Sequence, residues 1–270
     1  MFLAECVLQF AQLAHLLVNN SLVKPDEEVC DLQCEGLVCL QKKSGYKLTT
    51  DSVLLANFVE KEQTPPVVVE FCAGSGVISI LLSAKINPKK IYAVEIQKNL
   101  ADMCARSIKL NGLKNVCVES SSFQDFALKG GVMPSIIVAN PPYFRAEDGR
   151  LPTSEEIKKS RFEMDMTISS LITSAKQLLK NGGLLYLVHI TKRKAEIEKE
   201  LNKQGFYIKR LCYCFAKKGK PSHIFLLEAV LGQKCATQIL EPIILNNEDG
   251  TETEQLKAIY NRSGATKSGK

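Results

Sequence analysis

From residue 66 onward, short β-rich apolar runs alternate with helical segments, and this alternation constrains the fold more than any other feature of the chain. Strands are expected at residues 67–71, 90–96, 115–119, 135–139 and 184–190, and helices at residues 76–85, 97–110 and 167–180. Strands joined by crossover helices form a parallel sheet that helices cover on both faces. The sequence therefore predicts an α/β protein.

The last part of this region departs from the alternation. Residues 207–216 and 223–231 are two strand-like runs joined by a short basic loop, which predicts a C-terminal antiparallel hairpin at one sheet edge. A mixed seven-stranded sheet results. We expect a single domain over residues 25–260, an N-terminal extension of open status over residues 1–24, and a loose tail over residues 261–270.

The amino-acid composition limits the class of protein to which this chain can belong. With 45% apolar and 24% charged residues the chain is globular rather than fibrous. Residues 1–150 hold 15 Lys/Arg against 16 Asp/Glu, whereas residues 151–270 hold 20 against 13, so the net charge of +6 arises in the second half. A polyanionic partner would explain this asymmetry, and so would a cationic surface that only maintains solubility.

The ten cysteines lack zinc-ligand spacing and fall mostly in apolar stretches, so we interpret them as reduced thiols of a cytoplasmic protein, with no metal site. The apolar first 24 residues are interrupted by polar side chains and lack a basic start. A signal peptide and a membrane span are therefore both poor interpretations, and no membrane partner is expected.

A glycine-containing turn follows the first strand of the alternating region. Gly74 and Gly76 lie between a buried strand and a helix, where glycine lets a ligand approach the main chain. Glu70 closes the strand and is a predicted cofactor-binding residue. Glu95 ends the next strand, where a carboxylate can accept hydrogen bonds from both ribose hydroxyls. A dinucleotide is the alternative ligand, but its longer motif has glycine where this chain has Ser79. The combination resembles the first motif of class I methyltransferases, which have a Rossmann-like fold and bind S-adenosylmethionine.

A second motif, Asn140-Pro141-Pro142-Tyr143, follows the expected strand at residues 135–139 and so lies at the carboxyl edge of the sheet. The Asn140 side-chain oxygen and the Pro141 carbonyl could accept both hydrogens of an aromatic amine and support positive charge that develops on its nitrogen. Successive prolines stiffen the loop, and Tyr143 offers a ring for stacking on a base. The alternative is a rigid Pro-Pro turn in which Tyr143 only packs.

These residues resemble the amino-methyltransferases, and the flanking segments narrow the resemblance to the bacterial tRNA1(Val) adenine-N6-methyltransferase family. The similarity runs from about Asp31 to Tyr260. Its matching segments are Asp31-Leu32-Gln33 with Gly36-Leu37, residues 46–58 with their Thr50-Asp51-Ser52-Val53-Leu54-Leu55-Ala56 core, residues 70–76, residues 140–144, Ser160-Arg161-Phe162-Glu163, Lys220-Pro221, Leu226-Leu227-Glu228 and Asp249-Gly250.

The resemblance implies methylation of N6 of an adenine beside the anticodon of a valine tRNA, with S-adenosylmethionine and no metal. It implies that Thr50 and Asp51 approach the methionine end of the cofactor, with Asp51 also as N-cap of a helix over residues 52–60. It assigns cofactor contacts to Gly74, Gly76 and Glu95, and the chemistry to residues 140–143. This chain departs from the family after the third strand, where Asp125 is the candidate for contacting the cofactor adenine.

An adenine in RNA must leave its stack to reach Asn140, and phosphate contacts would offset that cost. Basic residues are expected on the same sheet edge, and Phe144 would extend the stacking surface of Tyr143. The predicted substrate-binding residues are Phe144, Lys192, Arg193, Lys217, Lys218 and Lys220. For the basic clusters, the alternative is a solvated helix start and a polar turn.

Two other functions remain open. A protein-glutamine methyltransferase uses the same Asn-Pro-Pro-Tyr motif, because a side-chain amide presents the same two hydrogens. It normally has a helical recognition domain, whereas only about 40 residues precede Tyr46. A non-catalytic RNA-binding protein would explain the charge but not the two motifs. The sequence leaves the oligomeric state open.

Overall fold

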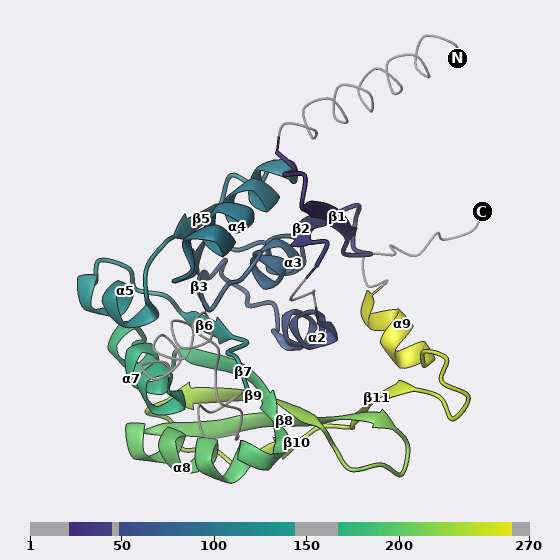
Figure 1. Ribbon diagram of the computed structural model, residues 1–270. Helices are drawn as coiled ribbons and strands as arrows, with labels where there is room; N and C mark the ends of the chain where they lie inside the picture. The colour runs from purple at the N-terminus through teal and green to yellow at the C-terminus, as the bar shows by residue number, and fades with distance from the viewer. Residues whose placement is uncertain (1–21, 45–48, 144–166, 261–270) are drawn as a thin grey trace, which may run out of the picture.

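The computed structural model describes residues 22–44, 49–143 and 167–260 (Figure 1). A large mixed sheet with helices on both faces forms its centre, and a separate two-stranded hairpin lies beside it. The strands are β1 Glu27–Asp31, β2 Val38–Lys42, β3 Val67–Phe71, β4 Lys90–Val94, β5 Val116–Glu119, β6 Ile136–Ala139, β7 Leu184–Ile190, β8 Phe206–Lys217, β9 Ile224–Leu231, β10 Gln238–Ile239 and β11 Ile243–Asn246. The helices are α2 Thr50–Phe58, α3 Val77–Lys85, α4 Lys98–Leu110, α5 Phe123–Lys129, α7 Ile168–Leu178, the short 3-10 helix Thr191–Arg193, α8 Lys194–Gln204 and α9 Glu254–Tyr260.

Seven strands of the large sheet follow the predicted plan. Their order is β5-β4-β3-β6-β7-β9-β8, with β3 to β7 parallel and β9 antiparallel to both of its neighbours. The predicted Rossmann-like mixed sheet with a C-terminal antiparallel hairpin is confirmed. Because β3 and β6 are adjacent and parallel, the segments that follow them emerge side by side at one carboxyl edge.

One detail of the prediction was wrong: the β8–β9 hairpin does not end the sheet. The short strands β10 and β11 pair in parallel with β8 and extend the sheet to nine strands among the described residues. Their few residues give little periodicity, so the sequence pattern did not reveal them. Strand β8, with its 12 residues, is long enough for both to pair with it.

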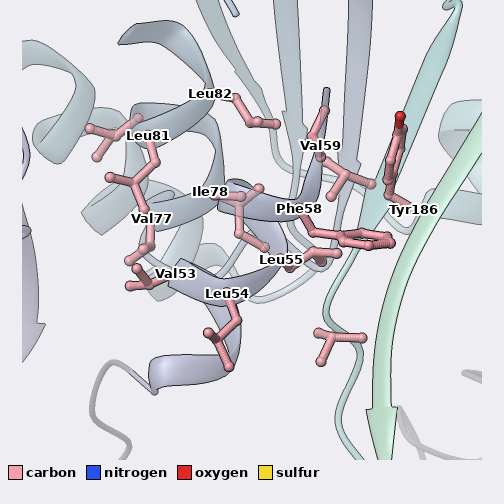
Figure 2. Packing of buried hydrophobic residues seen from close by; sticks show 14 of the residues in the cluster. Val53, Leu54, Leu55, Phe58, Val59, Val77, Ile78, Leu81, Leu82 and Tyr186 are labelled. Carbon is pink, nitrogen blue, oxygen red and sulfur yellow. The ribbon is translucent and has the colours of Figure 1, made fainter. Parts of the chain in front are cut away.

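Two hydrophobic cores fill the two faces of the sheet. Neighbouring residues of β3 point to opposite faces, so Val68 belongs to one core and Val69 to the other. Helices α2, α3, α4 and α9 contribute to the first core, and α5, α7 and α8 contribute to the second. Figure 2 shows the first core, where side chains of α2 and α3 pack together and Phe58 meets the ring of Tyr186 edge to face.

The start of α2 differs from the prediction in a way that matters for the site. The helix begins at Thr50 rather than at Ser52, and Thr49 is its N-cap residue, so Asp51 is not the cap. Asp51 lies inside the first helical turn, and its carboxylate bonds to a distant side chain instead of to a free amide of its own helix. The predicted capping role of Asp51 was therefore wrong.

The β1–β2 hairpin, which the sequence did not indicate, is anchored to α4. The Arg106 guanidinium donates two hydrogen bonds to the Glu27 carboxylate, at 2.5 and 2.9 Å, and Glu27 is 3% exposed. Arg106 also holds the pKa of Glu27 down, to about 2. Asn111, at the end of α4, bonds to both the amide and the carbonyl of Val38. The hairpin is thus fixed against the helix that follows Glu95.

Within the described ranges, no helix combines the length and the apolar character that a membrane span needs. The division into an extension, one domain and a tail stays a prediction. Phe144, the Ser160–Glu163 match, most of the N-terminal extension and the tail lie outside the described residues.

Candidate active site

The turn between β3 and α3 has an unusual backbone. Gly74 and Gly76 both have positive φ, at 57° and 88°, and so does Cys72, at 60°. A positive φ at a residue other than glycine costs free energy and is often found at functional sites. A Cβ added to Gly74 would meet nothing within 4 Å, so the main chain here faces open space. The predicted ligand-facing role of Gly74 fits this geometry.

Gly76 has a different reason to be glycine. A Cβ at this position would lie 2.6 Å from Sγ of Cys104 on α4. Gly76 is buried and does not line the pocket described below. The missing side chain lets α4 approach α3, so the observed contact is packing between helices.

Glu95 lies just after β4 and reaches back to the turn. One carboxylate oxygen accepts the Gly74 amide at 2.8 Å, and the other accepts the Gln97 amide at 2.9 Å. The residue is 5% exposed, and burial raises the pKa of its carboxyl group. Each carboxylate oxygen can accept more than one hydrogen bond, so Glu95 can hold the turn and still accept from ribose hydroxyls.

Glu70 is enclosed beneath the turn. One of its oxygens accepts hydrogen bonds from the Ser79 amide, at 2.9 Å, and from the Ser79 hydroxyl. Burial raises the pKa of Glu70 to about 8, although the hydrogen bonds from Ser79 oppose the shift. This contact explains why position 79 is serine. A glycine there, as in the dinucleotide-binding motif, would have no hydroxyl to donate to Glu70.

A pocket connects the turn with the Asn-Pro-Pro-Tyr segment. Its lining includes Glu70, Gly74 and Asn140. Further lining comes from Gln41 and Lys42 of β2, Thr49, and Ser52 of α2, none of which the sequence singled out. No local pattern marks Gln41 and Lys42, because β2 reaches the pocket through the packing of the hairpin against α4, which is distant in the chain.

The segment after β6 places Asn140 and Tyr143 together. Pro141 is buried and Pro142 is exposed. The Asn140 side-chain nitrogen donates to Oγ of Ser52 at 3.0 Å. The Tyr143 hydroxyl lies 2.6 Å from a carboxylate oxygen of Asp51 and 3.1 Å from the side-chain oxygen of Asn140. The sequence predicted where this motif lies but not that α2 holds it.

The ring of Tyr143 lies against that of His189 of β7, in a tilted arrangement with centroids 5.0 Å apart and planes at 46°. His189 is 1% exposed, and its Nδ1 accepts the Ile190 amide at 2.8 Å. Burial lowers the pKa of His189 to about 4, so the imidazole is neutral at pH 7. His189 thus packs against Tyr143.

Two predicted cofactor residues, Thr50 and Asp125, do not line this pocket. The hydroxyl of Thr50 accepts a long hydrogen bond from Tyr260, at 3.4 Å. Asp125 is exposed in the first turn of α5, where its carboxylate accepts from the Ser122 hydroxyl at 2.7 Å. The assignment of Thr50 and Asp125 to the cofactor stays a prediction.

Of the predicted basic residues, some already bind another group of the protein, and others form no ion pair with any described residue. Arg193 pairs with Glu196 at 2.7 Å, and Lys217 donates to the carbonyl of Glu248 at 3.1 Å. Lys192, Lys218 and Lys220 are exposed and form no ion pair with any described residue. Because β9 begins beside the end of β7, the Lys218–Lys220 turn lies toward the carboxyl edge, as expected.

The described residues contain no group of three or more His, Cys, Asp or Glu that could hold a metal ion. They do fit S-adenosylmethionine. Gly74 leaves its main chain open, Glu95 has acceptor positions for a ribose, and Asn140 lines the same pocket. The sheet order, the glycine turn, the acidic end of β4 and the motif after β6 together define a class I methyltransferase.

Comparison with known proteins supports this class. Residues 44–207 match the family described as "Methyltransferase small domain", and the chain belongs to that family. The methyl donor of this protein is S-adenosylmethionine, as the sequence predicts. The protein is similar to two proteins named tRNA1(Val) (adenine(37)-N6)-methyltransferase. The one from Photorhabdus laumondii is 26% identical over 80% of this chain and 88% of its own length. The one from Flavobacterium johnsoniae is 25% identical over 58% of this chain and 66% of its own length.

A solved structure shows the same fold. A predicted O-methyltransferase from Agrobacterium tumefaciens superposes with a TM-score of 0.62 at 17% identity, covering 80% of this chain and 97% of that one.

Proposed function

We propose that this protein methylates N6 of an adenine in RNA, within the anticodon loop of a tRNA, with valine tRNA as the first substrate to test. The observation that carries the proposal is the position of Asn140, which lines the pocket containing Gly74 and stands beside the ring of Tyr143. A methyl donor and a planar base can therefore meet at this residue. The names of the similar proteins point to the same substrate.

The chemistry follows from what these residues can accept. An adenine amine is a weak nucleophile because its lone pair is delocalised into the ring. Oδ1 of Asn140 and the carbonyl of Pro141 would accept its two hydrogens and stabilise positive charge that develops on the nitrogen. S-adenosylmethionine would supply an electrophilic methyl group, whose bond to the sulfonium sulfur breaks as the nitrogen attacks and leaves a neutral thioether. The amine proton then leaves through one of these acceptors to solvent.

The substrate would be held by stacking and by charge. Tyr143 presents a ring that is backed by His189, which limits its movement and suits it to hold an extruded base. Lys192, Lys218 and Lys220 are the open cations for backbone phosphates, whereas Arg193 and Lys217 are already engaged. Phe144 remains a proposed extension of the stacking surface.

The test uses the purified full chain, S-adenosylmethionine with a labelled methyl group, and valine tRNA transcripts with adenine or guanine beside the anticodon. Mass spectrometry of the nucleosides should find N6-methyladenosine only in the adenine transcript. Asn140→Ala should abolish transfer while changing cofactor affinity only a few-fold. A protein mixture offered in parallel should remain unlabelled.

Each other result favours another function. Label on protein glutamines and none on RNA would identify a protein-glutamine methyltransferase. Binding of RNA and cofactor without any transfer would identify a non-catalytic RNA-binding protein. Label on both transcripts would retain an RNA substrate but reject this adenine as the target.

A further inference from the structure

We propose that Asp51 and Ser52, in the first turn of α2, are positioning residues that set the hydrogen bonds of Tyr143 and Asn140. This inference rests on the proposed function, in which Oδ1 of Asn140 accepts a hydrogen of the target amine. It assigns to Asp51 a different task from the cofactor contact that the family resemblance implies, and it gives Ser52 a role that the sequence did not suggest.

Ser52 holds one end of the Asn140 side-chain amide. An asparagine side chain can rotate by 180° with little change in shape, which exchanges an acceptor for a donor. Nδ2 of Asn140 donates to Oγ of Ser52 at 3.0 Å, and in this rotation Oδ1 lies on the Tyr143 side, where the proposed function needs an acceptor. The opposite rotation would present N–H groups to an amine that also has N–H groups.

Asp51 keeps the Tyr143 proton away from Oδ1 of Asn140. The hydroxyl has one hydrogen and, among the described residues, two nearby acceptors, the Asp51 carboxylate at 2.6 Å and Oδ1 of Asn140 at 3.1 Å. The shorter contact, to a carboxylate, is the stronger one, so Tyr143 donates its hydrogen bond to Asp51 rather than to Asn140. The acceptor capacity of Oδ1 then remains for the substrate amine. Without Asp51, the hydroxyl would turn to Asn140 and compete with the substrate.

This arrangement predicts a specific dependence between two substitutions. Asp51→Ala should lower kcat at least about tenfold, because Oδ1 of Asn140 is then occupied. In a Tyr143→Phe background, where no hydroxyl competes, Asp51→Ala should lower kcat no more than about twofold. The affinity for S-adenosylmethionine, measured by calorimetry, should stay within about twofold in both backgrounds. A tenfold weaker affinity, or the same loss of kcat in the Phe background, would overturn the proposal.

Ser52 has a closely matched control in the same chain. Ser83 of α3 is also partly buried, and its hydroxyl donates to the side-chain oxygen of Asn115 at 3.1 Å. Ser52→Ala should lower kcat with little change in KM, Ser52→Thr should retain most activity, and Ser83→Ala should leave kcat unchanged. Equal losses for Ser52→Ala and Ser83→Ala would mean that the Ser52 hydroxyl acts only on stability.

A second measurement does not depend on activity. In protein labelled with ¹⁵N at asparagine, the Asn140 side-chain signals can be assigned by their disappearance in Asn140→Ala. Ser52→Ala should shift these signals and speed their hydrogen exchange, whereas Ser83→Ala should not. Unchanged signals would reject the role of Ser52 even if methylation is confirmed. Shifted signals would support it even if the RNA substrate proves wrong.

Discussion

The Gly74 amide donates a hydrogen bond to the Glu95 carboxylate at 2.8 Å, so the acid at the end of β4 also stabilises the turn after β3. The same carboxylate is the proposed acceptor for the ribose of S-adenosylmethionine. Glu95→Ala should therefore weaken cofactor affinity more than loss of a single ribose contact would, by at least about tenfold.

Glu95→Gln should have a smaller effect, because one oxygen remains to accept the Gly74 amide. Glu119→Gln is the control, since Glu119 ends the neighbouring strand β5 and is partly exposed. Calorimetric titration with S-adenosylmethionine measures all three. Cofactor affinity within twofold of the parent protein for Glu95→Ala would contradict the assignment.

Gly76 should be sensitive to substitution for two separable reasons. Gly76→Ala places a methyl group 2.6 Å from Sγ of Cys104 and forces alanine to adopt a φ of 88°, so the free energy of unfolding should fall by about 2–4 kcal/mol. Adding Cys104→Ala should restore part of the loss by removing the clash. Gly112→Ala isolates the conformational cost, because Gly112 has a φ of 63° and nothing near its absent Cβ. Urea denaturation measures each value, and equal losses for Gly76→Ala and Gly112→Ala would exclude the clash.

His189 should make the protein less stable in mild acid. Its pKa is about 4 in the folded protein, because the ring is buried, and near 6.5 in the unfolded chain, so the unfolded state binds the proton first as pH falls. The free energy of unfolding should fall between pH 6.5 and 4, by up to about 3 kcal/mol.

His189→Gln retains an acceptor for the Ile190 amide but does not titrate, so its stability should depend less on pH across this range. The carboxyl groups are common to both proteins and cancel in the difference. His223→Gln, at an exposed position, should follow the parent protein. If His189→Gln also follows the parent protein between pH 7 and 5, the histidine does not contribute this dependence.

The exposed lysines near the site should contribute to the salt dependence of RNA binding. Replacing Lys192, Lys218 and Lys220 by Gln should reduce the slope of log affinity against log salt by roughly 2, because each phosphate contact contributes about 0.7–0.9. A triple variant of Lys89, Lys109 and Lys114 removes the same charge near the amino ends of β4 and β5, at the opposite edge. Equal slopes for the two variants would show that only net charge matters.

Much of the fold and the location of the site could be predicted from the sequence alone. Strands β3 and β7 were predicted with the observed bounds, and the other five strands of the predicted sheet to within two residues at either end. Because parallel strands share a carboxyl edge, adjacency of β3 and β6 was enough to bring the glycine turn and Asn140 together. Periodicity and turn residues are local properties, so they can be recognised without knowledge of the fold.

The tertiary structure decided which partners these residues have. Tyr143 meets Asp51 and Asn140 meets Ser52 across about 90 positions of the chain, and Gly76 is glycine because α4 approaches it. The sequence determined that a glycine turn and an Asn-Pro-Pro-Tyr motif follow two parallel strands, because each motif is encoded within a few consecutive residues. Only the packing of α2 against the sheet decided where each hydroxyl and amide hydrogen points, because those contacts join segments whose spacing in the chain carries no signal of their proximity.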